Sequence, residues 1–271
     1  MTVIAVPRTG GSAYTLRAVI GETTKGLLLL WRRRAVLIMA TVSVGLIYLM
    51  IEFFVGAGRI DHGVLAATLP GLFAYAVASS AAVQGCGGIA EEINSGTLEQ
   101  AHLSPVPPSL LVLGRLGALA AEGLIPAVVL TAAFWTGFGV HYTVRPDALV
   151  PVVLTVADAL AYGLLMAALT VAVSSIGALG HVFNMIVMFF GGIFVPVTAY
   201  PHGVVIFARF VPTTLGVEVL NTALAGRGLG AAWTDGTLPW LLVHVVVLGS
   251  LGWYIYTFNI RRARREGGLS A

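Results

Sequence analysis

The sequence predicts an all-α integral membrane protein with six transmembrane helices. Composition gives two reasons: 58% of the 271 residues are hydrophobic, whereas only 10% are charged. A soluble domain carries about 25% charged residues, because a surface in contact with water needs polar cover. The third reason is that the apolar residues form runs of about 20, which is the length that crosses a bilayer as a helix.

Residues 1–34 are expected to be a cytoplasmic tail that leads into an amphipathic helix. Over residues 14–31, apolar side chains are interspersed with Arg17, Glu22 and Lys25, and Trp31 lies at the end. A helix of this pattern lies in the membrane interface, where a tryptophan acts as an anchor. We therefore expect an interfacial helix directly before the first span.

Residues 35–258 are expected to form one transmembrane domain. Its six spans are predicted near 35–55, 69–90, 117–138, 149–174, 182–197 and 238–258. The second span is rich in small residues, which let helices approach closely, and we expect Cys86 at such a contact. A polar loop is predicted over 56–68, a tight turn over 177–181 and a basic cytoplasmic tail over 259–271.

Residues 204–224 are too polar to cross a membrane intact, because Arg209, Pro212 and Glu218 interrupt them. Irregular backbone at membrane depth must be sheltered by protein. We therefore expect two short helices that form a re-entrant outer hairpin before the sixth span.

The basic residues predict the orientation, since six spans place both termini on one side of the membrane. Eleven basic residues lie on the side of the termini: Arg8, Arg17, Lys25, Arg32, Arg33, Arg34, Arg115, Arg261, Arg262, Arg264 and Arg265. Four lie on the other side: Arg59, Arg145, Arg209 and Arg227. Cytoplasmic loops carry an excess of Lys and Arg. We therefore expect a multi-pass protein of the cell inner membrane with both termini in the cytoplasm.

The sequence lacks the motifs that several classes of functional site require. The single lysine, Lys25, is followed by Gly26, so the chain has no P-loop for ATP. Cys86 is the only cysteine, which excludes an intramolecular disulfide and a cysteine metal cluster. The six histidines are scattered, and neither His-Glu-x-x-His nor Gly-x-Ser-x-Gly occurs. An intramembrane enzyme is therefore disfavoured.

A polar strip, residues 91–107 with the sequence EEINSGTLEQAHLSPVP, follows the second predicted span. Thr97 and Gln100 have the spacing of a capping box, which favours a helix start. Pro105 would end that helix, because a proline disfavours helical backbone in the residue before it. We expect a short cytoplasmic helix over 98–103; the alternative is an ordinary solvated loop.

Two sets of motifs stand out in the sequence. The first set is Gly96-Thr97-Leu98-Glu99-Gln100, then Ser104-Pro105-Val106, then Gly114-Arg115. The second set lies in the expected outer hairpin and comprises Phe194-Val195-Pro196, Pro201, Phe210-Val211-Pro212-Thr213, Glu218 and Asn221. With these motifs the chain resembles the type-2 ABC transporter permeases, in particular the daunorubicin-resistance type. Members often carry a basic residue before the Gly-Thr, where this chain has Asn94 and Ser95. This departure makes the strip negative and predicts a basic groove on its partner.

The resemblance implies the membrane subunit of an ATP-driven exporter of drugs, lipids or polysaccharides, with no catalysis of its own. Two permease subunits, identical or homologous, would sit on two copies of a separate cytoplasmic ATPase that binds ATP and Mg. This chain would bind no cofactor and no nucleic acid, and would contact membrane lipid. ATPase coupling is implied for the following residues: Glu91, Glu92, Gly96, Thr97, Leu98, Glu99, Gln100, Leu103 and Pro105.

The small-residue, apolar spans favour an amphiphilic drug or a lipid-like substrate, taken from the cytoplasm or the inner leaflet. A polysaccharide exporter and a cation exporter of the same family remain alternatives. A secondary transporter not driven by ATP is a further alternative. It is disfavoured because such folds show matched broken helices in two halves, whereas this chain has one broken stretch.

Acidic residues in apolar sequence are functional candidates, because a charge inside a membrane is costly. The candidates for a substrate path or a gate are Asp158, Glu122, Glu218, Pro196 and Pro212. Asp158 either faces a cationic substrate or a charge across the dimer, or hydrogen-bonds a neighbouring helix. Glu122 is expected to pair with Arg115. A further acid, Glu52, is expected to snorkel to the outer surface, and His244 to be a satisfied core residue.

Overall fold

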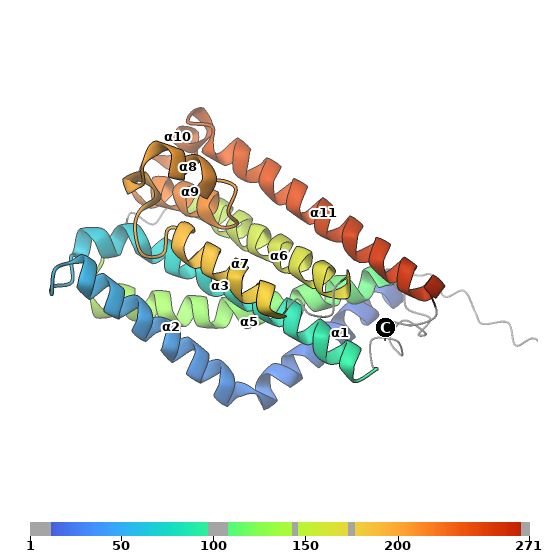
Figure 1. Cartoon of the computed structure of the whole chain (residues 1–271). Helices are drawn as coiled ribbons and strands as arrows, with labels where there is room; N and C mark the ends of the chain where they lie inside the picture. The colour runs from blue at the N-terminus through green and yellow to red at the C-terminus, as the bar shows by residue number, and fades with distance from the viewer. Residues whose placement is uncertain (1–11, 97–107, 143–145, 173–176, 267–271) are drawn as a thin grey trace, which may run out of the picture.

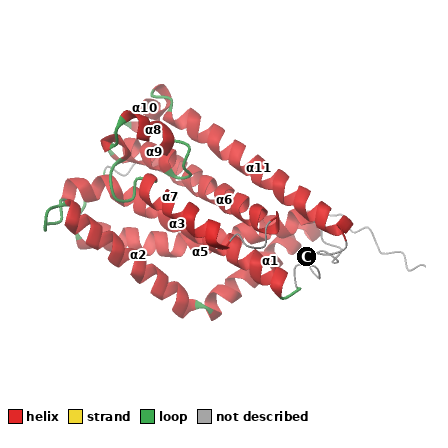
Figure 2. Cartoon of the chain, viewed as in Figure 1, coloured by secondary structure: helices red, strands yellow, loops and turns green. Residues whose placement is uncertain are grey.

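The computed structural model describes residues 12–96, 108–142, 146–172 and 177–266, and every regular element in them is helical (Figure 2). Five helical segments are long and apolar enough to cross a membrane, namely Arg34–Val55, His62–Asn94, Val112–Gly137, Pro146–Val171 and Thr237–Arg262. Each exceeds the length of about 20 residues that spans a bilayer. The chain is therefore a multi-pass membrane protein.

The long helices agree closely with five of the predicted spans. They are α2 (Arg34–Val55), α3 (His62–Asn94), α5 (Pro108–Gly137), α6 (Leu149–Ala172) and α11 (Thr237–Glu266), and the interfacial prediction corresponds to α1 (Ser12–Arg32). The loop predicted over 56–68 is shorter than expected, because Asp61 caps α3 by accepting hydrogen bonds from the amides of Gly63 and Val64. Helix α11 continues to Glu266, so the first part of the predicted basic tail is helical.

The fifth predicted span, 182–197, is the clearest difference. Its residues belong in part to α7 (Gly177–Phe190), a 14-residue helix that is only about 21 Å long. That length falls short of the roughly 30 Å of a hydrocarbon core. The tight turn predicted over 177–181 is wrong, because these residues form the start of α7.

Short helices follow α7 at one end of the molecule, in place of a straight crossing. They are η2 (Val197–Ala199), α8 (His202–Ala208), α9 (Thr214–Leu224) and α10 (Gly228–Thr234), and η1 (Pro146–Ala148) precedes α6. We call this the hairpin end; the opposite end, which holds α1 and the ends of α3 and α11, is the basic end (Figure 1).

Helix α3 is central and packs against α5, α6 and α7. Small residues let the backbones meet: a Cβ added at Gly85 would lie 2.8 Å from the Gly163 carbonyl oxygen, and one at Gly123 would lie 2.9 Å from the Cα of Val77. Cys86 is buried in the same packing, as predicted. Close contact through small residues substitutes for the hydrophobic effect, which gives little force between helices in lipid.

Helix α1 lies against α5 and exposes its apolar face. Thr23 donates a hydrogen bond from Oγ1 to the Gly114 carbonyl at 3.1 Å. On the other face Leu28 is 61% and Trp31 68% exposed. A helix is therefore present where it was predicted, and its position in the membrane interface stays a prediction.

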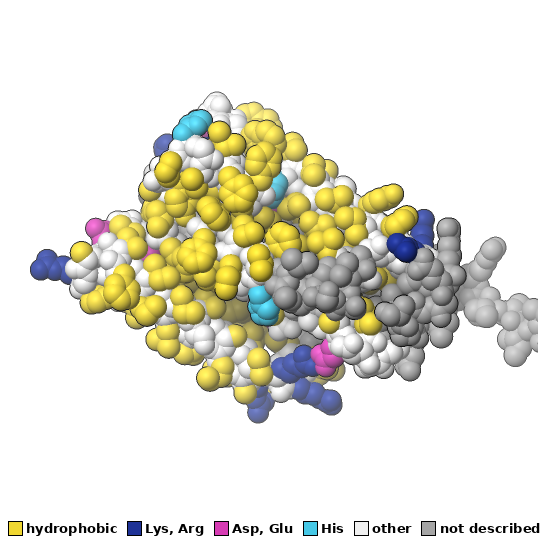
Figure 3. All heavy atoms as spheres, viewed as in Figure 1, with side chains coloured by type: hydrophobic (Ala, Val, Ile, Leu, Met, Phe, Trp, Pro, Cys, Tyr) yellow, Lys and Arg dark blue, Asp and Glu magenta, His cyan; other side chains and the backbone are white. Residues whose placement is uncertain are grey.

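Helix α2 stands apart from the bundle and diverges from it toward the basic end (Figure 1). Only Gly45, Tyr48 and Glu52 of this helix are buried. Figure 3 shows hydrophobic side chains over most of the face that it views, with Lys and Arg gathered near the ends. A surface of this kind suits a membrane, because it leaves few polar groups at hydrocarbon depth.

Candidate functional site

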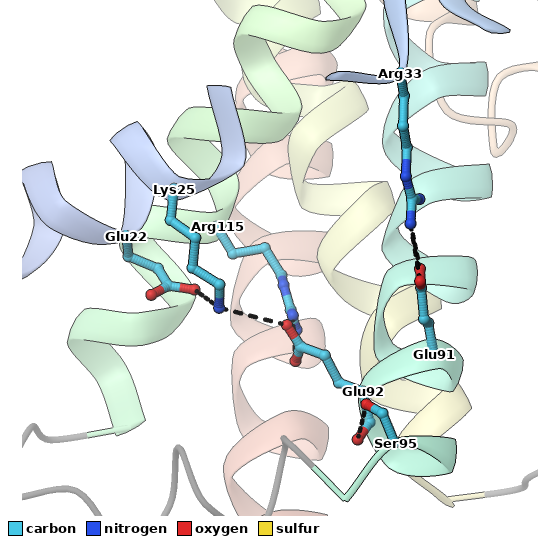
Figure 4. A network of polar contacts seen from close by, with 7 residues as sticks. All are labelled: Glu22, Lys25, Arg33, Glu91, Glu92, Ser95 and Arg115. Carbon is cyan, nitrogen blue, oxygen red and sulfur yellow. Dashed lines mark hydrogen bonds and ion pairs between the residues drawn. The ribbon is translucent and has the colours of Figure 1, made fainter. Parts of the chain in front are cut away.

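An ion-pair network at the basic end joins α1, α5 and the junction of α1 and α2 to the last turn of α3 (Figure 4). Arg33, the single residue between α1 and α2, donates from Nη2 to both carboxylate oxygens of Glu91 at 2.8 and 2.9 Å. Arg115 of α5 pairs with Glu92. Lys25 of α1 lies 3.1 Å from Glu22 and 3.9 Å from Glu92, measured between Nζ and Oε1.

Local packing positions these groups. The glycines of α1 and α5 let the two helices touch: Cβ atoms built at Gly114 and Gly117 would meet Glu22 and Thr23 at 2.5 and 2.9 Å. The pKa of Arg33 is raised, first by its hydrogen bond to Glu91 and then by the Glu91 charge. Arg33 therefore stays charged at any physiological pH.

The polar strip is described only at its start, since Thr97, Leu98, Glu99, Gln100, Leu103 and Pro105 lie outside the described residues. Glu91, Glu92 and Gly96 are described. Helix α3 ends at Asn94, and Gly96 adopts φ +67°, a left-handed conformation that glycine adopts without strain. The network thus binds the first two residues of the strip, which lie in the last turn of α3.

Glu122 departs from its predicted partner. The predicted pair with Arg115 is wrong, because Arg115 contacts Glu92 instead. Glu122 lies beside Gln84 of α3 and in the electrostatic field of Arg33. The seven-residue spacing placed Glu122 and Arg115 on similar helix faces, but the neighbouring helix decided the partner.

Asp158 of α6 is fully buried beside the turn that leads into α9. Its Oδ2 accepts a hydrogen bond from the Thr213 amide at 2.9 Å, and its Oδ1 lies 2.8 Å from Nδ1 of His244. The second ring nitrogen of His244 lies 3.3 Å from the Phe210 carbonyl oxygen. The structure thus shows the hydrogen bonds to neighbouring elements that the second interpretation of Asp158 expected, and His244 is satisfied as predicted.

Thr213 was missed by sequence reasoning. Its φ of +81° is rare for a residue with a side chain, and the buried carboxylate of Asp158 holds its amide. The only signal in the sequence is its place after Pro212, where the chain must turn into α9.

Glu52 does not snorkel, and that prediction is wrong. Its side chain is 1% exposed and lies 2.6 Å from Oγ1 of Thr68, which is also 2.8 Å from the Tyr48 hydroxyl. This buried cluster ties α2 to α3 at the hairpin end. Although Glu52 lies one turn from the end of α2, its carboxyl group contacts the Thr68 hydroxyl on α3 and stays buried.

Pro196 and Glu218 line one cavity of about 630 Å³ at the hairpin end, whereas Pro212 does not line it. Glu218 pairs loosely with Arg209, whose Nη2 is 3.3 Å from Oε2. Burial raises the pKa of Glu218 more than Arg209 lowers it. Within the described residues, no group of three His, Cys, Asp or Glu side chains could hold a metal ion.

Comparison with known families decides the class of this membrane protein. The model of the ABC-2 type transporter family matches residues 20–224, about three quarters of the chain. The chain belongs to the ABC-2 type transporter family. No curated protein matches it. The match confirms the resemblance to type-2 ABC permeases, and the matched residues run from within α1 through the polar strip to the end of α9.

Membership defines the kind of subunit. An ABC-2 type membrane domain is a transmembrane part of a transporter and is generally not itself catalytic. The last helix, α11, lies beyond the matched residues but packs along α6. Its Asn259 donates from Nδ2 to the Ala168 carbonyl at 3.1 Å, so α11 belongs to the same bundle.

Proposed function

We propose that the chain is the permease subunit of an ATP-driven exporter, working with a separate cytoplasmic ATPase that binds ATP and Mg. Two permease chains, identical or homologous, would assemble with two ATPase copies in the inner membrane. The basic end, with both termini, faces the cytoplasm. An amphiphilic drug or a lipid-like molecule leaves the cytoplasm or the inner leaflet, and the drug-export branch would give antibiotic resistance.

The observation that supports this function best is the ion-pair network at the root of the strip. A strip that docks on an ATPase can move the bundle only if it is mechanically attached to it. Arg33, at the junction of α1 and α2, and Arg115 of α5 bind the adjacent acids of α3. Closure of the ATPase would therefore be passed to α1, α2, α3 and α5 as motion of packed helices.

The test uses the permease expressed together with the ABC-type ATPase that copurifies with it. Leu98→Ala and Glu99→Lys remove the apolar and acidic contacts of the strip, and we expect both to lower ATP-dependent efflux in vesicles and stimulation of the ATPase. Asp235→Lys reverses an exposed acid at the hairpin end and is expected to change neither. Unchanged coupling in both strip variants would overturn the docking role.

The same vesicles separate the alternatives. A secondary transporter would keep its transport after ATP depletion, whereas an ABC exporter would lose it. A panel of amphiphiles, inorganic cations and oligosaccharides distinguishes the substrate classes. We expect saturable, ATP-dependent movement of the amphiphiles alone.

A further inference from the structure

Two adjoining cavities lie at the basic end, one polar and one largely apolar. The polar cavity, about 300 Å³, sits among α1, α3 and α5 and contains the ion-pair network. The apolar cleft, about 540 Å³, lies between α2 and the pair α3 and α5. Arg33 and Gln84 line both, so the two cavities meet at these side chains. Each volume is in the range of sites for drug-sized molecules or their parts.

The apolar cleft exists because α2 diverges from the bundle (Figure 1). Its walls include Val36, Val44 and Val83, with the hydroxyl groups of Ser79 and Ser80 on α3. Val36 is 65% and Val83 38% exposed, so the rim opens on the apolar flank of the molecule. An apolar molecule dissolved in the membrane could enter the cleft from that side without crossing water.

The polar cavity carries an excess of acid. Its lining has four carboxylates, Glu22, Glu91, Glu92 and Glu122, against three bases, Lys25, Arg33 and Arg115, which leaves one formal negative charge. Figure 4 shows how the first three acids are matched with the bases in two groups. Glu122 shows no ion pair within the part of the chain that the structure describes. It lies beside Gln84, a residue that lines both cavities.

We propose that these cavities form one binding site for amphiphilic organic cations, with the cationic group at Glu122 and the apolar body in the α2 cleft. The proposal deepens the proposed function by naming a substrate class and its site. An anion at this position would face an unmatched carboxylate, and a neutral molecule would leave it without a counter-charge. Charge complementarity therefore favours a cation over an isosteric anion.

The test measures equilibrium binding to the permease alone in lipid nanodiscs, with empty nanodiscs as background. Tetraphenylphosphonium and tetraphenylborate have nearly the same shape and opposite charge. We expect saturable binding of the phosphonium only. Glu122→Gln should weaken that binding about tenfold, because it removes one charge-assisted contact. Asp235→Asn, which neutralises an exposed acid at the hairpin end, should leave binding unchanged.

A second pair of variants locates the site and leaves Glu122 unchanged. This pair tests the proposal even if Glu122→Gln does not fold. Val83→Trp fills the cleft, whereas Val129→Trp adds the same bulk to a lipid-facing position of α5 outside it. We expect Val83→Trp to abolish phosphonium binding and Val129→Trp to leave it unchanged. Equal binding in both, or equal affinity for the borate, overturns the proposal.

The binding assay needs no ATPase, so its outcome is independent of the exporter proposal. Suppose that phosphonium binding depends on Glu122 and Val83 but the chain shows no ATP-driven transport. This outcome would support the site and contradict the exporter function. ATP-driven transport of amphiphiles, together with unaltered binding in Glu122→Gln and Val83→Trp, would support the exporter function and overturn the proposed site.

Discussion

Asp158 holds two elements at once, because each of its carboxylate oxygens serves a different partner. One accepts the amide of Thr213 and the other meets His244. Asp158→Ala leaves both partners buried and unpaired, and we expect it to cost about 3 kcal/mol in the free energy of unfolding. Asp158→Asn keeps an acceptor oxygen for Thr213 and should cost clearly less.

Thermal unfolding of the purified chain in detergent checks this ranking. Asp235→Ala serves as the control, because Asp235 is exposed and its removal is expected to shift the midpoint little. Equal midpoints for Asp158→Ala and Asp158→Asn would show that the bond to Thr213 contributes nothing.

Glu218 predicts a pH dependence at the hairpin end. Burial raises its pKa above the ordinary 4.5, the opposing effect of Arg209 being smaller. The folded chain therefore holds this proton to higher pH than the unfolded chain does. Its contribution to stability is present below pH 4.5 and is lost as the pH rises through the folded pKa.

Glu218→Gln removes this titration. We expect the unfolding midpoint of the wild type to fall relative to that of Glu218→Gln as the pH is raised above 4.5. A series of melting curves across that range measures the difference. Parallel pH profiles for the two proteins would contradict the buried position of Glu218.

At the scale of elements, α1 can pack closely on α5 because glycine residues at the contact have no side chain. A Cβ built on Gly26 would collide with the Cβ of Ala118. Gly26→Ala should therefore push α1 away and destabilise the chain by about 1–3 kcal/mol. Ala118→Gly removes the colliding atom, so the double variant should recover most of the loss.

Gly21→Ala is the matched control, because nothing lies within 4 Å of a Cβ at this position of the same helix. We expect it to raise stability slightly, since alanine favours helix over glycine by up to about 1 kcal/mol. Unfolding midpoints of the four variants measure the comparison. If Gly21→Ala and Gly26→Ala behaved alike, α1 would not pack on α5 as described.

Elements also show how far the sequence could predict the fold. Apolar length predicted five spans well, because hydropathy measures what a helix exposes to lipid. It failed over 177–197, where glycine at Gly177 and Gly180 was interpreted as a turn although both residues lie in α7. Glycine favours turns in water, but in close-packed membrane helices it also provides contact surfaces.

The partners of charged groups could be predicted only in part. Spacing along one helix gives the face of a residue, but the rotation and tilt of the next helix select its partner. Glu122 was therefore assigned to Arg115 in its own helix. In the structure α3 provides the neighbours of both residues: Gln84 lies beside Glu122, and Glu92 pairs with Arg115. The bond from Asp158 to the Thr213 amide depends on a backbone turn that no periodicity reports.

At the scale of the whole molecule, the link between Arg33 and Glu91 should matter for coupling far more than for stability. Both side chains are more than half exposed, and such a pair contributes about 0.2–1 kcal/mol to folding. However, it is the contact that joins the junction of α1 and α2 to the root of the strip. In the proposed exporter, motion of the strip reaches the diverging helix α2 through this pair.

Charge reversal separates the two roles. Arg33→Glu and Glu91→Arg each place like charges together, and we expect each to reduce ATP-driven transport several-fold while shifting the unfolding midpoint little. The double variant restores the attraction with opposite polarity and should regain most of the transport. Arg59→Glu, at the hairpin end, is the control for net charge. Additive losses in the double variant would show that the two residues act separately, and coupling would then have to run through Arg115 and Glu92 alone.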